Sequence, residues 1–281
     1  DPVKLLNPIA SQLSVMRSSL IGSLMQVLKF NVDRKAPRVR VFELGRVFFK
    51  DASVVDSDTT VKGFYQPMRV AGLAYGAAEQ LQWGRVDAKV DFYDVKGDVE
   101  ALLAPLKPVF EPAEHPAMHP GRCARVLLDG QAIGFVGELH PQWRQEWDLA
   151  QAPVMFELEL DAVLARQVPV FAPVAKHQAV ERDIAVVVKE AVTHAQVMQA
   201  IAAGVPGGML RHAVLFDVFR PKKLKAGEEA APGSLAQDEK SLAVRLTLGR
   251  DDASLTDVDI DTAMQAAIAA LQTQVQARLR G

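Results

Sequence analysis

Apolar and polar residues alternate with a period of two in residues 210–219 (LRHAVLFDVF), which predicts a β-strand. On one side of this strand, Asp217 and Phe219 are expected to face outward, with Leu215 on the same side. The opposite side, which is expected to meet a core, comprises Val214, Phe216 and Val218. An exposed carboxylate beside an exposed ring requires an explanation other than core packing.

The segments around this strand predict one compact unit. Thr193 is expected to cap a helix that ends at Gly204, and residues 256–275 have apolar residues at helical spacing. Strands are predicted at residues 182–189, 210–219, 241–249 and, in a shorter form, 277–280. The order β-α-β-β-α-β is the ferredoxin-like plan, and the open face of such a sheet often binds RNA.

The preceding residues predict an antiparallel sheet with helices set apart from it, an α+β domain. Asp129-Gly130 separates two alternating runs and is a strong hairpin signal. Asp94 is expected to be the N-cap of a helix over residues 94–106, and Gly45 is expected to mark a bulge or bend in a strand over residues 38–49. Two more strands are predicted, at residues 68–76 and 153–160.

Residues 14–34 predict a helix with a broad apolar stripe. The stripe contains Leu20, Leu24, Val27 and Leu28, and Ile21 and Met25 widen it. Packing against a sheet accounts for such a stripe. A second interpretation is that part of it faces another subunit.

The composition limits the class of protein. With 281 residues, 49% of them hydrophobic, the chain is long enough for two domains, and the two prolines within residues 168–173 predict the boundary. A net charge of −2 excludes a globally basic nucleic-acid coat. Cys123 is the one cysteine, which excludes an internal disulfide and favours a reducing, cytosolic compartment. No segment has the pattern of a membrane span or signal peptide, and the start at Asp1 suggests a piece of a longer protein.

Cations follow the predicted strand directly. Arg220, Lys222 and Lys223 come after Phe219, and Arg211 and Lys225 flank the stretch. An aromatic ring beside cations suits single-stranded nucleic acid, whose bases stack while its phosphates meet the charges. An ordinary edge strand that runs into a solvated, Lys-rich loop explains the stretch equally simply, and is favoured when the stretch is considered alone.

Patterns typical of enzymes are missing from the sequence: it contains no GxxxxGK[ST], GxGxxG, HExxH or GxSxG motif. His115, His119 and His140 are weak metal candidates, because the prolines of HPAMHP prevent the helix that would align the first two. A turn at residues 119–122 explains that segment better. Glu43, in an apolar strand, would need a partner if buried, and Arg40 or Arg46 is nearest in sequence.

Several motifs in order resemble one family, the C-terminal part of the beta subunit of bacterial phenylalanine-tRNA ligases, and the resemblance covers essentially the whole chain. In the first part the matching motifs are NPIASQLSVMRSSLIGSLMQVLKFNVDR at 7–34, VFELGRVF at 41–48, DFYDVKGDVEALL at 91–103, HPGR at 119–122 and GELHP at 137–141. In the second part they are ERDIAVVV at 181–188, LFDVFRPKK at 215–223 and KSLAVRLTL at 240–248.

The resemblance implies that residues 1–168 form a domain shaped like a class II synthetase core, without catalytic residues. Class II ligases hold ATP with aromatic-Arg-x-acid and a later Gly-x-Gly-x-x-x-Arg; here Arg40 lies three residues before Glu43, Val39 precedes it, and the second motif is absent. By resemblance, activation of phenylalanine belongs to the alpha subunit, two alpha and two beta subunits form a cytoplasmic heterotetramer, and the whole enzyme uses ATP and magnesium. No cofactor is expected in this part. Residues 14–34 are then a candidate partner surface.

The resemblance also implies that residues 169–281 are a ferredoxin-fold domain that binds the anticodon loop of phenylalanine tRNA. By motif, Phe219 would stack on a base, Asp217 would accept from a base edge, and Ser241 would bond a base or phosphate. Phosphate attraction would come from Arg220, Lys222, Lys223 and Lys225. The segment 225–239 is longer than the family leads us to expect. DNA and membranes are not expected partners, whereas a self-sufficient ligase and a purely structural interaction module remain alternatives.

Overall fold

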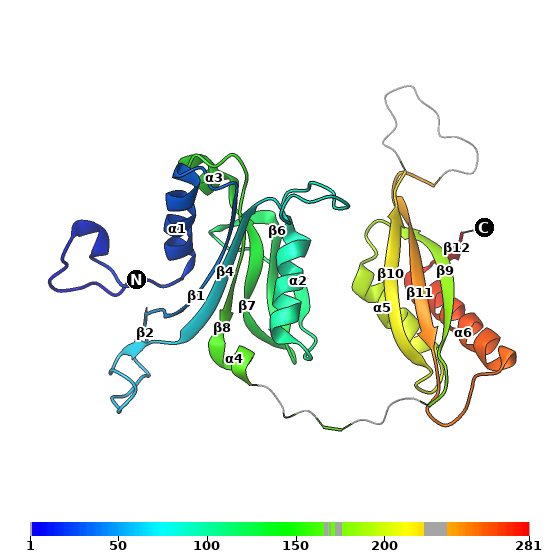
Figure 1. Ribbon diagram of the computed structural model, residues 1–281. Helices are drawn as coiled ribbons and strands as arrows, with labels where there is room; N and C mark the ends of the chain where they lie inside the picture. Colours follow the sequence, from blue (N-terminus) through cyan, green and yellow to red (C-terminus); the bar gives the residue numbers. More distant parts are fainter. Residues whose placement is uncertain (1, 166–167, 169, 172–175, 222–234, 281) are drawn as a thin grey trace. The chain divides into compact units, whose positions relative to one another are not determined.

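The structure is a computed structural model that describes residues 2–165, 168, 170–171, 176–221 and 235–280. The chain divides into two compact units, Asp1–Val168 and Pro169–Gly281 (Figure 1). Each unit has its own hydrophobic core, and each is described separately below.

The first unit is built on a six-stranded antiparallel sheet with the strand order β1-β4-β8-β7-β6-β5. Its strands are β1 (Arg38–Arg46), β4 (Met68–Gly76), β5 (Val109–Pro112), β6 (Met118–Leu128), β7 (Gln131–Leu139) and β8 (Val154–Glu159), beside a two-stranded ribbon of β2 (Phe49–Lys50) and β3 (Phe64–Tyr65). Its helices are η1 (Ser11–Leu13), α1 (Ile21–Asp33), α2 (Phe92–Leu103), α3 (Pro141–Glu146) and α4 (Leu160–Leu164).

Helices α1 and α2 cover opposite faces of this sheet (Figure 1). The interior strand β4 contributes side chains to both faces: Leu73 and Tyr75 belong to the core cluster of α1, whereas Val70 and Ala74 belong to that of α2. The chain turns between β6 and β7 at Asp129-Gly130, where both residues have positive φ (50° and 79°). Leu128 and Gln131 pair across this two-residue turn, so the predicted hairpin is confirmed. Asp-Gly is a favoured sequence for a tight turn with two positive φ angles.

Four local predictions for this unit need correction. Helix α1 begins at Ile21 rather than near residue 14, and Val27 is exposed instead of buried with the stripe. Asp91, not Asp94, is the N-cap of α2. Its carboxylate accepts hydrogen bonds from the N–H groups of Tyr93 and Asp94, and the carboxylate of Asp94 accepts one from the N–H of Asp91. Gly45 marks no bulge, since β1 and β4 pair in continuous register there. Residues 119–122 lie inside β6, in an irregular stretch, rather than in a turn before it.

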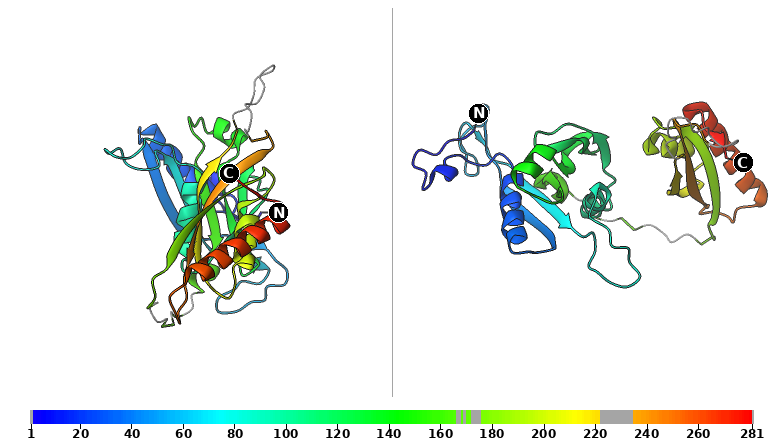
Figure 2. Two further views of the ribbon diagram at one scale, coloured as in Figure 1. Left: turned by 90° about the vertical axis from the view of Figure 1, so that its right-hand side faces the viewer. Right: turned by 90° about the horizontal axis from the view of Figure 1, so that it is seen from above.

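The second unit is a four-stranded antiparallel sheet with two helices. Its elements in order are β9 (Val180–Lys189), α5 (His194–Gly204), β10 (Leu210–Phe219), β11 (Glu239–Leu248), α6 (Asp257–Val275) and β12 (Arg278–Leu279). The strand order is β10-β11-β9-β12 (Figure 1), and α6, red and orange in Figure 2, lies across one face of this sheet. Thr193 and Thr256 cap the two helices, each in a reciprocal pair of bonds with the residue three positions on. The predicted βαββαβ order is confirmed.

Candidate nucleic-acid interface

One face of the second sheet is covered and the other is open. Side chains that alternate along β9 and β11 join those of α5 and α6 in a single core; the strand residues are Ile184, Val186, Val188, Leu242, Val244, Leu246 and Leu248. Both helices of this unit therefore lie on the same face. No helix among the unit's described residues covers the opposite face.

The edge strand β10 contains a β-bulge that decides which side chains reach the open face. Its pairing with β11 passes from Leu215↔Val244 directly to Asp217↔Ala243, so Phe216 is the extra residue. Leu215 lies opposite Val244, which belongs to the helix-side core, and therefore packs against that core.

Val214 and Phe216, which were predicted to meet the core, are therefore exposed, whereas Val218 lies opposite the core residue Leu242, on the predicted side, and is 39% exposed at the sheet edge. The prediction is wrong for Val214 and Phe216. On this strand it is Ala213 and Leu215 that pack against the core. The side chains do alternate with a period of two, but for Val214 and Leu215, which precede the bulge, the core face and the open face were exchanged in the prediction.

Phe219 and Asp217 are accessible on this strand. Phe219 lies opposite Ser241 and is 45% exposed, and Asp217 lies opposite Ala243 and is exposed. Within the described part of the chain, the carboxylate of Asp217 has no hydrogen bond or ion pair. The ring is available for stacking, and the carboxylate can accept hydrogen bonds from a base edge.

Ser241 is much less accessible than Phe219. It is 3% exposed, and Nη1 of Arg280 donates to its Oγ at 3.4 Å. The guanidinium carbon of Arg280 also lies 5.0 Å from the ring centroid of Phe219, within the range of a cation–π contact. The backbone N–H of Arg280 donates to the carbonyl of Ala185 on β9, which anchors this residue at the end of the chain.

Arg280 was missed from the sequence. A signal was present, because Arg278 and Arg280 alternate in a terminal strand and so share a face. The sequence did not show that this arginine would extend to a phenylalanine on β10, since β11 and β9 lie between β12 and β10.

The basic cluster is only partly described. Arg220 donates to both carboxylate oxygens of Glu190, with distances of 2.9–3.1 Å, and this hydrogen-bonded pairing lowers the pKa of Glu190. Glu190 thus offsets much of the charge of Arg220. Lys222, Lys223 and Lys225 lie outside the described residues, as does most of the segment 225–239.

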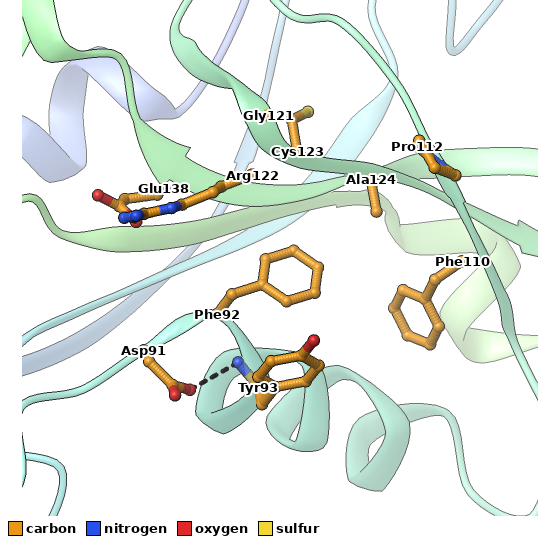
Figure 3. A pocket seen from close by; sticks show the side chains of 10 residues that line it. All are labelled: Asp91, Phe92, Tyr93, Phe110, Pro112, Gly121, Arg122, Cys123, Ala124 and Glu138. Carbon is orange, nitrogen blue, oxygen red and sulfur yellow. Dashed lines mark hydrogen bonds and ion pairs between the residues drawn. The ribbon is translucent and has the colours of Figure 1, made fainter. Parts of the chain in front are cut away.

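A pocket of about 630 Å³ lies in the first unit, between the start of α2 and strands β5 to β7. Figure 3 shows three aromatic side chains on its walls, those of Phe92, Tyr93 and Phe110. Its polar groups already serve the fold: Asp91 caps α2, and Arg122 pairs with Glu138 at 2.7 Å. The geometry gives no pair of free carboxylates for acid–base chemistry.

Glu43 and Arg40 also have structural partners. Glu43 pairs with Arg17 rather than with Arg40 or Arg46, while Arg40 pairs with Asp98 at 2.8 Å. Arg17 approaches the backbone at Gly45, where a side chain would collide with its guanidinium. Among the described residues, no group of three or more His, Cys, Asp or Glu side chains could hold a metal ion.

Comparison with known proteins identifies the family. Residues 1–160 match the family model described as "Phenylalanyl tRNA synthetase beta chain CLM domain", which is more than half of the chain. The chain belongs to the phenylalanyl-tRNA synthetase beta-chain family. Residues 175–280 match the model described as "Ferredoxin-fold anticodon binding domain". The resemblance and the α+β fold class expected from the sequence are thereby confirmed.

Relatives named "Phenylalanine--tRNA ligase beta subunit" align along the whole chain. Those of Cupriavidus pinatubonensis and Ralstonia nicotianae are each 51% identical to it over 285 and 284 residues, and that of Chromobacterium violaceum is 47% identical over 280 residues. In each case 100% of this chain is covered. The chain spans only about a third of those beta subunits, 34% of the first two and 33% of the third. Of the helices described, none has the length and apolar character needed to cross a bilayer.

Proposed function

We propose that this chain is the tRNA-binding and subunit-assembly part of a phenylalanine-tRNA ligase. Its second unit reads the anticodon loop of phenylalanine tRNA on the open face of the sheet. Asp217, Phe219, Ser241 and Arg220, together with Lys222 and Lys223, are the residues we assign to RNA contact. The proposal is supported above all by the half-exposed ring of Phe219 beside the unpaired carboxylate of Asp217, in a unit that matches an anticodon-binding family.

The geometry ranks these contacts. Phe219 and Asp217 can meet a base without rearrangement, whereas Ser241 becomes accessible only when Arg280 moves away from its hydroxyl. Arg220 can attract a phosphate only in competition with Glu190. Stacking and base-edge bonding therefore contribute more than charge in the described part of this face.

The whole enzyme, in this proposal, joins phenylalanine to its tRNA with ATP and magnesium, and the chemistry belongs to the alpha subunit. Two alpha and two beta subunits form the complex. We assign the magnesium of the whole enzyme to parts outside this chain; among the described residues, no group of three or more His, Cys, Asp or Glu side chains could hold a metal ion. A cytoplasmic location is supported by the lone, unpaired Cys123.

Assembly is assigned to the first unit. On α1, Val27 and Phe30 are exposed whereas Leu24 and Leu28 are buried, which supports the segment 14–34 as a partner surface. We also propose that the functional domains are residues 1–168 and 169–281, an assignment supported by the two separate cores.

The experiment is a binding titration of the 281-residue chain with the anticodon stem-loop of phenylalanine tRNA, at several fixed salt concentrations. Phe219→Ala is expected to weaken binding about 5- to 150-fold, the equivalent of about 1–3 kcal/mol for one stacked base. Asp217→Ala should also weaken it, because a base edge loses its acceptor. Phe42→Ala, which removes an exposed phenylalanine from a strand of the first unit, is the matched control and should bind like the unsubstituted chain. Equal binding by all four proteins would leave only a structural interaction module.

A further inference from the structure

A second phenylalanine–arginine pair lies on the open face of the sheet. Phe216 is 54% exposed, more than Phe219, and the guanidinium carbon of Arg245 lies 5.4 Å from the centroid of its ring. Arg245 belongs to β11 and stands between Val244 and Leu246, both of which point into the helix-side core. Arg245 and the ring beside it are consequently on the face that no helix covers.

The β-bulge explains why both rings are accessible. A strand without it would place residues 216 and 219, three apart, on opposite faces. With Phe216 as the extra residue, Phe216 and Phe219 both reach the open face, and Asp217 lies between them. Bulges commonly redirect side chains in this way beside functional sites.

The floor between the two rings is made of small side chains. Ala243 lies opposite Asp217 on one side and opposite Ala185 on the other. A flat base can therefore approach the sheet between the two rings, where the large neighbouring side chains are the two arginines, Arg245 beside Phe216 and Arg280 beside Phe219.

Arg245 is held rigidly. Its Nε and Nη2 donate to the two carboxylate oxygens of Asp183 at 2.8 and 2.9 Å, and Glu181 lies 3.5 Å from its Nη1. The hydrogen bonds to Asp183 raise the pKa of Arg245 further above its ordinary value. Two nearby acids offset its charge, so Arg245 offers a fixed planar surface rather than an attraction for phosphate.

We propose that Phe216, supported by Arg245, is a second stacking position for an unpaired base, next to the position at Phe219. The inference rests on the proposed RNA-binding function and extends it to a neighbouring nucleotide of the same loop. RNA fits better than a protein partner, because two rings with planar arginines beside them, separated by a free acceptor, suit successive bases.

The test uses the full chain, the same stem-loop and three variants. Phe216→Leu keeps an apolar side chain but loses the ring, and should weaken binding at least about 5-fold. Phe216→Tyr keeps the ring and should bind like the unsubstituted chain. Arg245→Lys keeps the charge but loses the planar fork, and should weaken binding while leaving the slope of affinity against salt unchanged, because no phosphate contact is lost.

The outcomes separate this inference from the proposed function. Loss of affinity in Phe219→Ala without loss in Phe216→Leu overturns the inference and leaves the function standing. No loss in either variant overturns both. Equal losses in Phe216→Leu and Phe216→Tyr also overturn it, since the ring would then not be responsible. Replacing single loop nucleotides with abasic ones should abolish the effect of Phe216→Leu at one position and that of Phe219→Ala at another.

Discussion

Replacing Glu157 should destabilise the first unit more than replacing any exposed acid. Glu157 is 6% exposed, and it accepts hydrogen bonds from Arg69, from the hydroxyl of Ser19 at 2.6 Å and from the N–H of Leu20 at 2.9 Å. Leu20 is the N-cap position of α1 and supplies no capping side chain of its own. A carboxylate on β8 thus contributes to capping a helix that is distant in sequence, together with the hydroxyl of Ser19, which accepts from the N–H of Ile21 at 3.1 Å.

The magnitude follows from what remains after Glu157→Ala. Removing one partner of a buried ion pair costs about 3–5 kcal/mol, but Arg69 would still bind Glu159 at 2.8 Å, so we expect about 2–4 kcal/mol. Glu159→Ala is the matched control: that acid is more exposed and leaves the pair with Glu157 intact, so its loss should cost about 0.5–1 kcal/mol.

Tryptophan fluorescence during urea unfolding measures both variants. The three tryptophans all lie in the first unit, and Trp143 and Trp147 pack against the core that contains α1, so the signal follows this unit alone. If Glu157→Ala and Glu159→Ala shift the urea midpoint equally, the capping role assigned to Glu157 is refuted.

Three other predictions address separate features. Arg280→Ala should lower the slope of log affinity against log salt by about 1 if Arg280 meets a phosphate, and a titration of the stem-loop across salt concentrations measures it; an unchanged slope would exclude that contact. Burial lowers the pKa of His115, and its Nδ1 accepts from the N–H of Ala117, so the stability contributed by the neutral ring is complete above pH 6.5 and is lost as the pH falls below that value. His115→Asn keeps an acceptor that does not titrate, and its urea midpoint should fall less between pH 7.5 and 5.5 than that of the unsubstituted chain. Gly134→Ala should destabilise the first unit by about 1–3 kcal/mol, because a Cβ there would lie 2.8 Å from the Cα of Leu158. Gly97→Ala, where a Cβ would meet open space on α2, should instead stabilise this unit by about 0.5–1 kcal/mol. Thermal unfolding of the two variants compares them.

Local sequence patterns predicted the elements whose signals are themselves local. The Asp-Gly turn, the two threonine caps in the second unit and the βαββαβ order each depend on residues a few positions apart. The N-cap of α2 shows the limit of this approach: Asp91 and Asp94 form a reciprocal pair, and the spacing of two acids does not say which one precedes the helix.

Long-range partners could not be inferred in the same way. Glu43 meets Arg17 rather than its sequence neighbours, and Glu157 accepts from the N–H of Leu20, the N-cap residue of α1. The site shows the same division. The outward position of Asp217 and Phe219 was predicted from alternation, but Phe216 was assigned to the core, because a bulge has no clear signature in a strand of mixed apolar residues.

The ion pairs of the second unit limit the net positive charge on its open face. Arg245 pairs with Asp183, Arg220 with Glu190, and Arg278 with Glu239 at 2.7 Å. Among the described residues of that face, Arg280 has a hydroxyl and a ring beside it but no carboxylate. Paired arginines contribute little net charge, so in the proposed complex we expect the phosphate backbone to gain little from most of these cations and specificity to come from the rings and from Asp217. A face of this kind binds weakly to any RNA whose bases are paired, since stacking requires bases that are already unpaired.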